Sequence, residues 1–233
     1  MRSTAKVKMT HLQKNHGTLL AFLLLIILSG PLLHQRAGYN WLMDFFLVLL
    51  LLAAVRTVAT HKRHLVIGLT LGLPALVSQI SVVYPELSWL TPLRDLSTAL
   101  FLFWVSGLIL RDIIMRIHTV TTDLIIGAIN VYLMVAVGFA FLYGLIEFLQ
   151  PGSFTGLEEL VSIPDRVLYF IYFSFTTVTT LGYGDISPLT PFSMTASFIE
   201  AIFGQLYLAI LVARLVALYI GSRNSPIREQ GPE

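Results

Sequence analysis

Seven consecutive residues, Thr179-Thr180-Leu181-Gly182-Tyr183-Gly184-Asp185, combine two glycines with hydroxyl side chains in a pattern that suits cation binding by the main chain. We call this segment the signature loop. Glycine adopts positive φ without steric cost, so Gly182 and Gly184, each next to a larger residue, allow successive backbone carbonyls to point the same way. Stacked rings of such carbonyls can replace the hydration shell of an ion in a narrow pore. The hydroxyl of Thr180 would add the innermost ring of ligands.

The residues before the signature loop predict a short helix. Ser162-Ile163-Pro164-Asp165 has the composition of a capping box, with a serine N-cap, a proline in the first turn and an acidic residue three positions later. A helix over 163–178 would reach about half of the distance across a bilayer. That length is typical of a re-entrant helix, whose partly negative C-terminal end would face a dehydrating cation.

Composition places the chain in a membrane. Of its 233 residues 56% are hydrophobic and 12% are charged, and the mean hydropathy is +0.79. Six apolar stretches are long enough to span a bilayer, at about 18–34, 41–59, 65–84, 88–110, 123–148 and 193–220. The chain has no cysteine, no P-loop motif and only scattered histidines, so nothing supports an enzyme or a metal-dependent hydrolase.

With these flanks, the signature loop resembles the selectivity filter of the potassium channel family, whose signature is T-[VLI]-G-Y-G-D. The resemblance is to six-transmembrane members with one pore loop per chain, of the prokaryotic kind that lacks voltage-sensor arginines. It implies K⁺ bound at Thr180, Leu181, Gly182 and Tyr183, with Gly184 completing the filter. It is specific over about 160–220 and only architectural before residue 111. A tight membrane loop is the alternative, because G-x-G alone also occurs in turns.

The resemblance also assigns residues that support the filter. Thr179 and Asp185 flank it, and Thr176 stands where some relatives carry a glutamate that pairs with the aspartate after the filter. Asp185 therefore needs another donor, and the hydroxyl of Tyr172 is our candidate. In the family this bond helps to set filter inactivation.

The last apolar stretch carries the residues expected to gate the pore. Gly204 lies twenty positions after Gly184, where the family commonly has a hinge glycine, although close helix packing would also explain a glycine inside a helix. The same helical face predicts an apolar cavity lining, formed by Leu208, Val212 and Val216. Glu200 is a carboxylate at membrane depth and should be functional or paired, but the sequence does not identify its partner.

The sequence predicts an all-α membrane protein with six transmembrane helices, a re-entrant pore helix and a filter that is completed in a tetramer. Its expected parts are a basic N-terminus (1–17), a peripheral four-helix bundle (18–110), an interfacial linker helix (111–122), a pore domain (123–220) and a short tail (221–233). The pore domain would contain the pore helix (163–178), the filter (179–185) and the inner helix (193–220).

The peripheral bundle lacks a row of sensing charges. Its fourth stretch has Arg94, followed directly by Asp95, and no further basic residue before Arg111. A voltage sensor needs several, because one charge crossing 100 mV supplies only about 2.3 kcal/mol. We expect little or no intrinsic voltage sensing. Asp44 is a candidate partner for Arg94, or else a carboxylate near the outer interface.

Most of the 15 Lys and Arg residues fall on one side of the six stretches, so both termini are expected to be cytoplasmic. The location would be the plasma membrane, or the inner membrane of a bacterium, in multi-pass form. The opposite loop, from Glu147 to Asp165, is acidic and would lie near the pore mouth or simply be a solvated loop. A basic start followed by the apolar run Leu19–Leu28 also fits a signal peptide, but no convincing cleavage site follows.

The predicted function is passive, potassium-selective conduction by a homotetramer. Its expected partners are K⁺ and membrane lipid, without nucleic acid and without a cofactor other than the permeant ion. The alternatives are a non-selective cation channel and a membrane sensor or scaffold that contains a pore-like loop.

Overall fold

The computed structural model of the protein describes residues 16–33, 39–58, 62–115, 121–157 and 166–223. In these residues the protein is all-α apart from one pair of two-residue strands. The elements are α1 (His16–Leu33), α2 (Tyr39–Val58), α3 (Lys62–Val77), α4 (Ile80–Val83), the 3₁₀ helix η1 (Pro85–Leu90), α5 (Thr91–Met115), α6 (Thr122–Leu149), β1 (Phe154–Thr155), α7 (Arg166–Val178), β2 (Ser187–Pro188) and α8 (Pro191–Arg223).

Three helical segments in the described part of the chain are long and apolar enough to cross a membrane. They are Glu86–Met115, which joins η1 to α5, then Thr122–Leu149 and Pro191–Arg214. The apolar helices His16–Leu28, Phe45–Thr57 and Arg63–Val77 are shorter. Three of the six predicted spans therefore have spanning length in the described residues. Helix α5 continues without a break to Met115, past residue 110 where the sequence predicted a separate linker helix.

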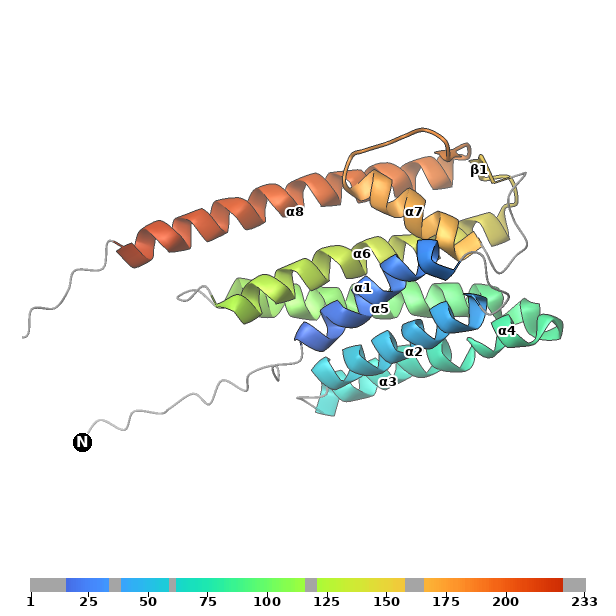
Figure 1. Ribbon diagram of the computed structural model, residues 1–233, viewed down its shortest axis with the longest axis horizontal. Helices are drawn as coiled ribbons and strands as arrows, with labels where there is room; N and C mark the ends of the chain where they lie inside the picture. Colours follow the sequence, from blue (N-terminus) through green and yellow to red (C-terminus); the bar gives the residue numbers. More distant parts are fainter. Residues whose placement is uncertain (1–15, 34–38, 59–61, 116–120, 158–165, 224–233) are drawn as a thin grey trace, which may run out of the picture.

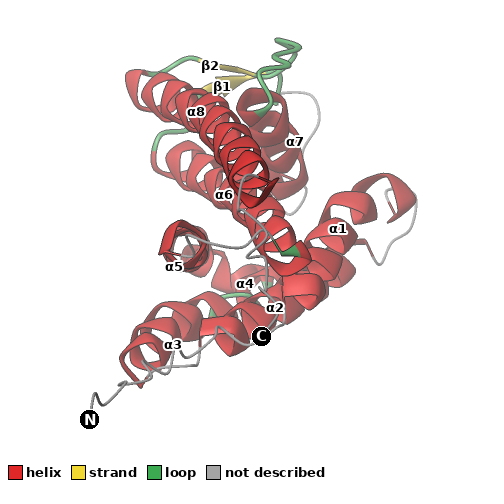
Figure 2. Cartoon of the chain, turned by 90° about the vertical axis from the view of Figure 1, so that its left-hand side faces the viewer, coloured by secondary structure: helices red, strands yellow, loops and turns green. Residues whose placement is uncertain are grey.

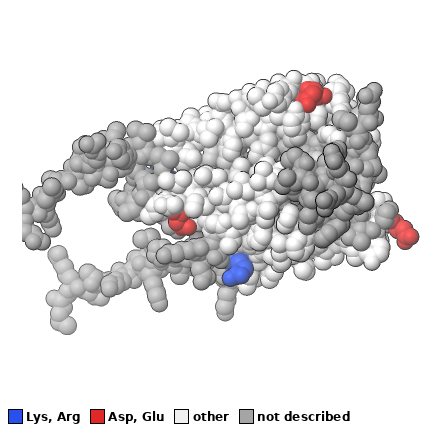
Figure 3. Space-filling view, viewed as in Figure 1, with Lys and Arg blue, Asp and Glu red and all other residues white. Residues whose placement is uncertain are grey.

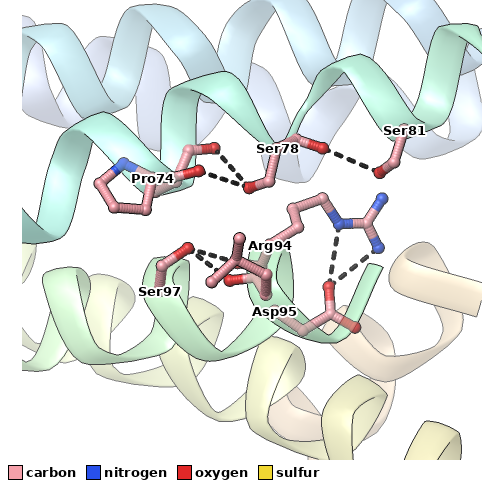
Figure 4. A network of polar contacts seen from close by, with 8 residues as sticks. Pro74, Ser78, Ser81, Arg94, Asp95 and Ser97 are labelled. Carbon is pink, nitrogen blue, oxygen red and sulfur yellow. Dashed lines mark hydrogen bonds and ion pairs between the residues drawn. The ribbon is translucent and has the colours of Figure 1, made fainter. Parts of the chain in front are cut away.

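The predicted third span, over 65–84, is divided in the structure. Helix α3 ends at Val77, and the short helix α4 begins only at Ile80. The hydroxyl of Ser78 donates to the carbonyl of Pro74 at 2.6 Å, and that of Ser81 donates to the carbonyl of Ser78 at 2.8 Å. The N–H of Ser78 still binds the Pro74 carbonyl, but those of Gln79 and Ser81 bind carbonyls three residues earlier, and serine hydroxyls that bind helix carbonyls favour such a bend (Figure 4).

The helices form two groups with α5 between them (Figures 1 and 2). Helices α6, α7 and α8 pack against one another on one side, and α3 packs on the other side of α5. Helix α2 packs between α1 and α3, and α1 also reaches α6. The far end of α8 extends beyond α7 in Figure 1. There Arg214 Nη2 donates to the carbonyl of Ile114 at 3.0 Å, which ties α8 to the end of α5.

The surface of the described residues is apolar, as expected for helices that face lipid or other subunits. Few charged side chains appear on the face in Figure 3. Large hydrophobic side chains are exposed instead, among them Val66, Leu73, Ile114, Phe198 and Ile210. A protein surrounded by water would not leave this much apolar surface uncovered.

Arg94 and Asp95 form a buried ion pair on α5. Only 7% of Arg94 and 2% of Asp95 are exposed, and the guanidinium Nε donates to Asp95 Oδ1 at 2.9 Å (Figure 4). A Cβ added to Gly144 would lie 2.9 Å from Asp95 Oδ2, so this carboxylate rests against α6. The side chain of Asp44, the other candidate partner of Arg94, lies outside the described residues.

Removing one member of this pair should destabilise the protein strongly. The substitution Arg94→Met leaves the carboxylate of Asp95 buried without its partner, which costs about 3–5 kcal/mol. We expect a clearly lower melting temperature in detergent for Arg94→Met, and recovery of most of the loss in the double variant Arg94→Met/Asp95→Leu. A single variant as stable as the wild type would contradict the assignment of a buried pair.

Candidate functional site

Helix α7 is a short helix held by aromatic contacts. Its 13 residues, Arg166–Val178, are too few to cross a membrane, and the predicted capping box at 162–165 lies outside the described residues. Phe170 and Phe173 are buried and meet the ring of Phe154 edge-on, with centroids 5.1 Å and 5.5 Å apart. Tyr143 of α6 packs edge-on against Phe173 at 5.0 Å. These rings fix α7 against α6 and the strand β1.

The backbone of the signature loop alternates between positive and negative φ. The φ angle is 60° at Thr180, 54° at Gly182 and 81° at Gly184, whereas Leu181 and Tyr183 do not have positive φ. This alternation gathers successive N–H groups on one side of the chain and leaves the carbonyls to the other. The sequence predicted the positive φ of both glycines. It did not predict that of Thr180, where a left-handed conformation costs about 1–2 kcal/mol.

The N–H groups of the loop are bound by the end of α7. The N–H groups of Leu181 and Gly182 both donate to the carbonyl of Thr176, at 2.8 Å and 3.1 Å, and that of Thr180 donates to the carbonyl of Thr177 at 2.9 Å. The hydroxyl of Thr176 donates to the carbonyl of Phe173 at 2.9 Å. Thr176 therefore contacts the loop through its main chain. Its side chain is committed within α7.

The predicted hydrogen bond between Tyr172 and Asp185 is present. The hydroxyl of Tyr172 donates to Asp185 Oδ2 at 2.6 Å, and the ring of Tyr172 stacks on that of Tyr183 with an interplanar angle of 9°. The other oxygen of Asp185 accepts the N–H of Ile186 at 3.0 Å. The hydroxyl of Thr179 donates to the carbonyl of Phe175 at 2.6 Å. Both ends of the signature loop are thus tied to α7.

A strand pair anchors the chain after the loop. Phe154 and Thr155 of β1 pair antiparallel with Pro188 and Ser187 of β2. Glu147 fixes the turn before β1, because its two carboxylate oxygens accept the N–H groups of Gly152 and Ser153, each at 2.9 Å.

Glu147 is only 7% exposed. Glu147 therefore stabilises this turn, whereas the sequence suggested an acidic residue of a loop near the pore mouth or in solvent. The other acidic residues of that loop, Glu158, Glu159 and Asp165, lie outside the described residues.

Gly204 brings α8 into direct contact with the end of α7. A Cβ added to Gly204 would overlap the carbonyl oxygen of Val178, the last residue of α7. Helix α8 is one continuous helix through this position. Close packing therefore accounts for the glycine in this structure, and the hinge stays a prediction.

The carbonyl of Val178 also accepts the hydroxyl of Tyr132 at 3.1 Å. The end of α7 is thus held by α6 as well as by α8.

The residues that follow Gly204 include one polar contact that the sequence did not suggest. Gln205 is exposed, and its Nε2 donates to Thr180 Oγ1 at 3.2 Å. Leu208 and Val212 are 44% and 57% exposed, and the side chain of Val216 lies outside the described residues. An amide therefore lies beside the hydroxyl of Thr180 near the start of the signature loop, and exposed apolar residues follow it on α8.

The structure also supplies the partners of Glu200. This residue of α8 is fully buried, with its two carboxyl oxygens 2.5 Å from the hydroxyls of Tyr143 on α6 and Ser174 on α7. Both partners are far from Glu200 in sequence, so periodicity alone could not identify them. A side chain of α8 thereby joins all three helices of this part of the protein.

These contacts hold one side of the signature loop against α7, while its other side is exposed. Leu181 is 55% and Tyr183 is 67% exposed, and a Cβ added to Gly182 or Gly184 would meet nothing within 4 Å. The alternating φ angles would turn backbone carbonyls toward this exposed side, where they would be hard oxygen ligands for a cation. One chain supplies them from one direction only.

Comparison with known proteins finds a match in this part of the chain. Residues 131–220, from within α6 to within α8, match the model of the ion channel family. Two-pore potassium channel 5 of Arabidopsis thaliana is 37% identical over 57 residues, which are 24% of this chain. The chain covers 14% of that relative's length. No solved structure matches the chain. The matched family is one of channels and not of enzymes, as the sequence predicted.

Adding a methyl group at Gly204 should disturb the end of α7. The Cβ of Gly204→Ala would overlap the backbone of Val178, and such overpacking costs about 1–3 kcal/mol, more than the helix propensity gained by alanine. We expect a lower melting temperature in detergent. The matched control is Gly107→Ala on α5, where the added Cβ meets nothing within 4 Å and stability should hold or rise. Equal behaviour of the two variants would rule out the close contact.

Proposed function

We propose that this chain is one subunit of a homotetrameric potassium channel that conducts K⁺ passively across a membrane. The observation that carries the proposal is the alternating φ of Thr180, Gly182 and Gly184 with the residues between them. It would leave backbone carbonyls available to a dehydrated ion, while the N–H groups of Thr180, Leu181 and Gly182 are bound by α7. K⁺ would be held at Thr180, Leu181, Gly182 and Tyr183.

Two arguments support the proposed tetramer, one from ion coordination and one from the exposed surface. One loop supplies one quarter of each carbonyl ring, and identical subunits arranged around an axis complete it. Leu181 and Tyr183 are exposed in the single subunit, and the same holds for a row of apolar residues on α8. These are Phe198, Ile202, Leu206 and Ile210. Neighbouring subunits would cover part of this surface.

Selectivity for potassium is supported by two features. The signature loop has the sequence T-L-G-Y-G-D, and the similar plant protein is named a potassium channel. The bond from Tyr172 to Asp185 and the stacking of Tyr172 on Tyr183 would keep the ring diameter constant. Leu208, Val212 and Val216 would line the cavity below, and an apolar constriction there could close by dewetting.

The proposed topology has six spans with both termini in the cytoplasm, in the plasma membrane or a bacterial inner membrane. Helices α1, α2 and α3 would provide the three spans that are shorter in the described residues, and lipid would surround the bundle. Arg94 is neutralised by Asp95 on the same helix. Moving this pair through the membrane field would transfer little net charge, so we propose that voltage has little direct effect on opening.

Reconstitution tests the proposal directly. We expect the purified protein in planar bilayers to give currents that reverse close to the K⁺ equilibrium potential under opposed K⁺ and Na⁺ gradients. Gly182→Ala should abolish this selectivity, because an L-residue at a φ of 54° costs about 1–2 kcal/mol and would reorient the carbonyls.

A matched control is Gly17→Ala, which also places its Cβ in open space but on the helix α1, and it should leave the currents unchanged. Reversal near the Na⁺ potential, equal permeability to both ions, or absence of current from a folded protein would each contradict the proposal.

Removing the hydroxyl of Tyr172 should shorten the time that the filter conducts. Tyr172→Phe deletes the bond to Asp185, worth on the order of 1 kcal/mol, while it preserves stacking on Tyr183. We expect faster decay of the current at constant voltage and unchanged stability of the assembled protein. Tyr169→Phe, one turn earlier on α7, is the control. If the currents of both variants decay as slowly as that of the wild type, the bond from Tyr172 to Asp185 does not support the filter.

A further inference from the structure

Glu200 is a buried carboxyl group without a basic partner in the described part of the chain. It is 0% exposed, and its neighbours at hydrogen-bond distance are the hydroxyls of Tyr143 and Ser174, which are also 0% exposed. The ion pair of Arg94 with Asp95 lies on α5 and does not involve Glu200. An ionised carboxylate in such a place is very costly unless charge and hydrogen bonds compensate it fully.

The number of available protons shows whether these contacts require the protonated or the ionised form of Glu200. Ser174 Oγ lies 2.6 Å from the carbonyl oxygen of Ala136 and 2.5 Å from Glu200 Oε1. A serine hydroxyl has one proton, and a backbone carbonyl can only accept. At 2.6 Å the proton of Ser174 is needed toward Ala136, since two oxygens without a proton between them repel each other. The short contact between Ser174 and Glu200 then requires a proton from Glu200.

We propose that Glu200 is protonated and acts as a positioning residue that fastens α7 between α6 and α8. Tyr143 donates to Glu200 Oε2, Glu200 donates through Oε1 to Ser174, and Ser174 donates to the carbonyl of Ala136. Each hydroxyl proton is used once and each acceptor is filled. This series of hydrogen bonds begins at Tyr143 and ends at Ala136, both on α6. Between them it passes through Glu200 of α8 and Ser174 of α7.

Through its position relative to the signature loop, this series of hydrogen bonds also affects the pore. Ser174 and Val178 lie one turn apart on α7, and the residues of α8 that contact them, Glu200 and Gly204, are also one turn apart. Helix α8 therefore holds α7 at two successive turns along one face. Thr176, whose carbonyl binds the N–H groups of the loop, lies between these two points.

The substitution Glu200→Gln distinguishes the protonated from the ionised form. The amide of glutamine can accept from Tyr143 and donate to Ser174, which is the pattern of a protonated glutamate. An ionised glutamate would accept from both hydroxyls, and the NH₂ group of glutamine would then meet a donor. We expect Glu200→Gln to melt like the wild type in detergent, and Glu200→Leu to yield on the order of tenfold less folded protein.

Infrared spectroscopy of the purified full-length protein in lipid detects the proton itself. At neutral pH, the wild-type minus Glu200→Gln difference spectrum should contain the C=O band of a protonated carboxylic acid. Tyr143→Phe, which removes the donor to that C=O, should move the band to higher frequency without abolishing it. The control Glu147→Gln removes a carboxylate whose two oxygens both accept backbone N–H bonds, and should remove no such band.

The expected effect on the pore rests on the proposed function, whereas the protonation of Glu200 does not. If Glu200→Gln removes only carboxylate bands, or destabilises as much as Glu200→Leu, the inference is overturned even in a protein that conducts K⁺. If the wild type carries no K⁺ current, the proposed function fails, and the infrared and melting data still decide the protonation. In a conducting protein, Glu200→Gln should keep K⁺ over Na⁺ selectivity within about twofold and Glu200→Leu should lose it.

Discussion

The geometry of this pore domain depends on where the signature loop places its backbone N–H groups. A loop that offers successive carbonyls to an ion must satisfy its N–H groups on the opposite side, because unpaired backbone donors are costly away from water. The carbonyl of Thr176 receives two of them and that of Thr177 receives a third. The end of α7 is therefore both a helix terminus with free carbonyls and the template that fixes the loop.

Because the loop takes its position from α7, every contact of α7 also acts on the loop. Helix α6 contributes Tyr132 at Val178 and the carbonyl of Ala136 at Ser174, and α8 contributes Gly204 and Glu200. The aromatic rings around Phe154 add apolar packing at the other end. Polar groups close to the loop and rings further away give α7 one orientation, which hydrophobic packing alone would leave loosely specified.

The sequence predicted the local features of this arrangement and missed those that depend on distant partners. The glycines at positive φ and the short helix before them follow from residue types at close spacing, and the bond from Tyr172 to Asp185 was implied by the family resemblance. The partners of Glu200 lie 57 and 26 residues away, and Gln205 reaches back 25 residues to Thr180. Only the fold brings these residues together. The positive φ of Thr180 is imposed by its neighbours, so its own residue type gave no signal.

Helix α5 packs closely on α6 at two small residues, Gly138 and Gly144. Gly144 allows the carboxylate of Asp95 to rest on α6, and a Cβ there would also lie near the ring of Phe170 on α7. Tyr143, the neighbour of Gly144, is the first donor in the series of hydrogen bonds that ends at the carbonyl of Ala136. A displacement of α5 would therefore reach α7 through adjacent residues of α6. Because Arg94 is paired with Asp95 on the same helix, a displacement of α5 that keeps the pair together would carry little net charge with it.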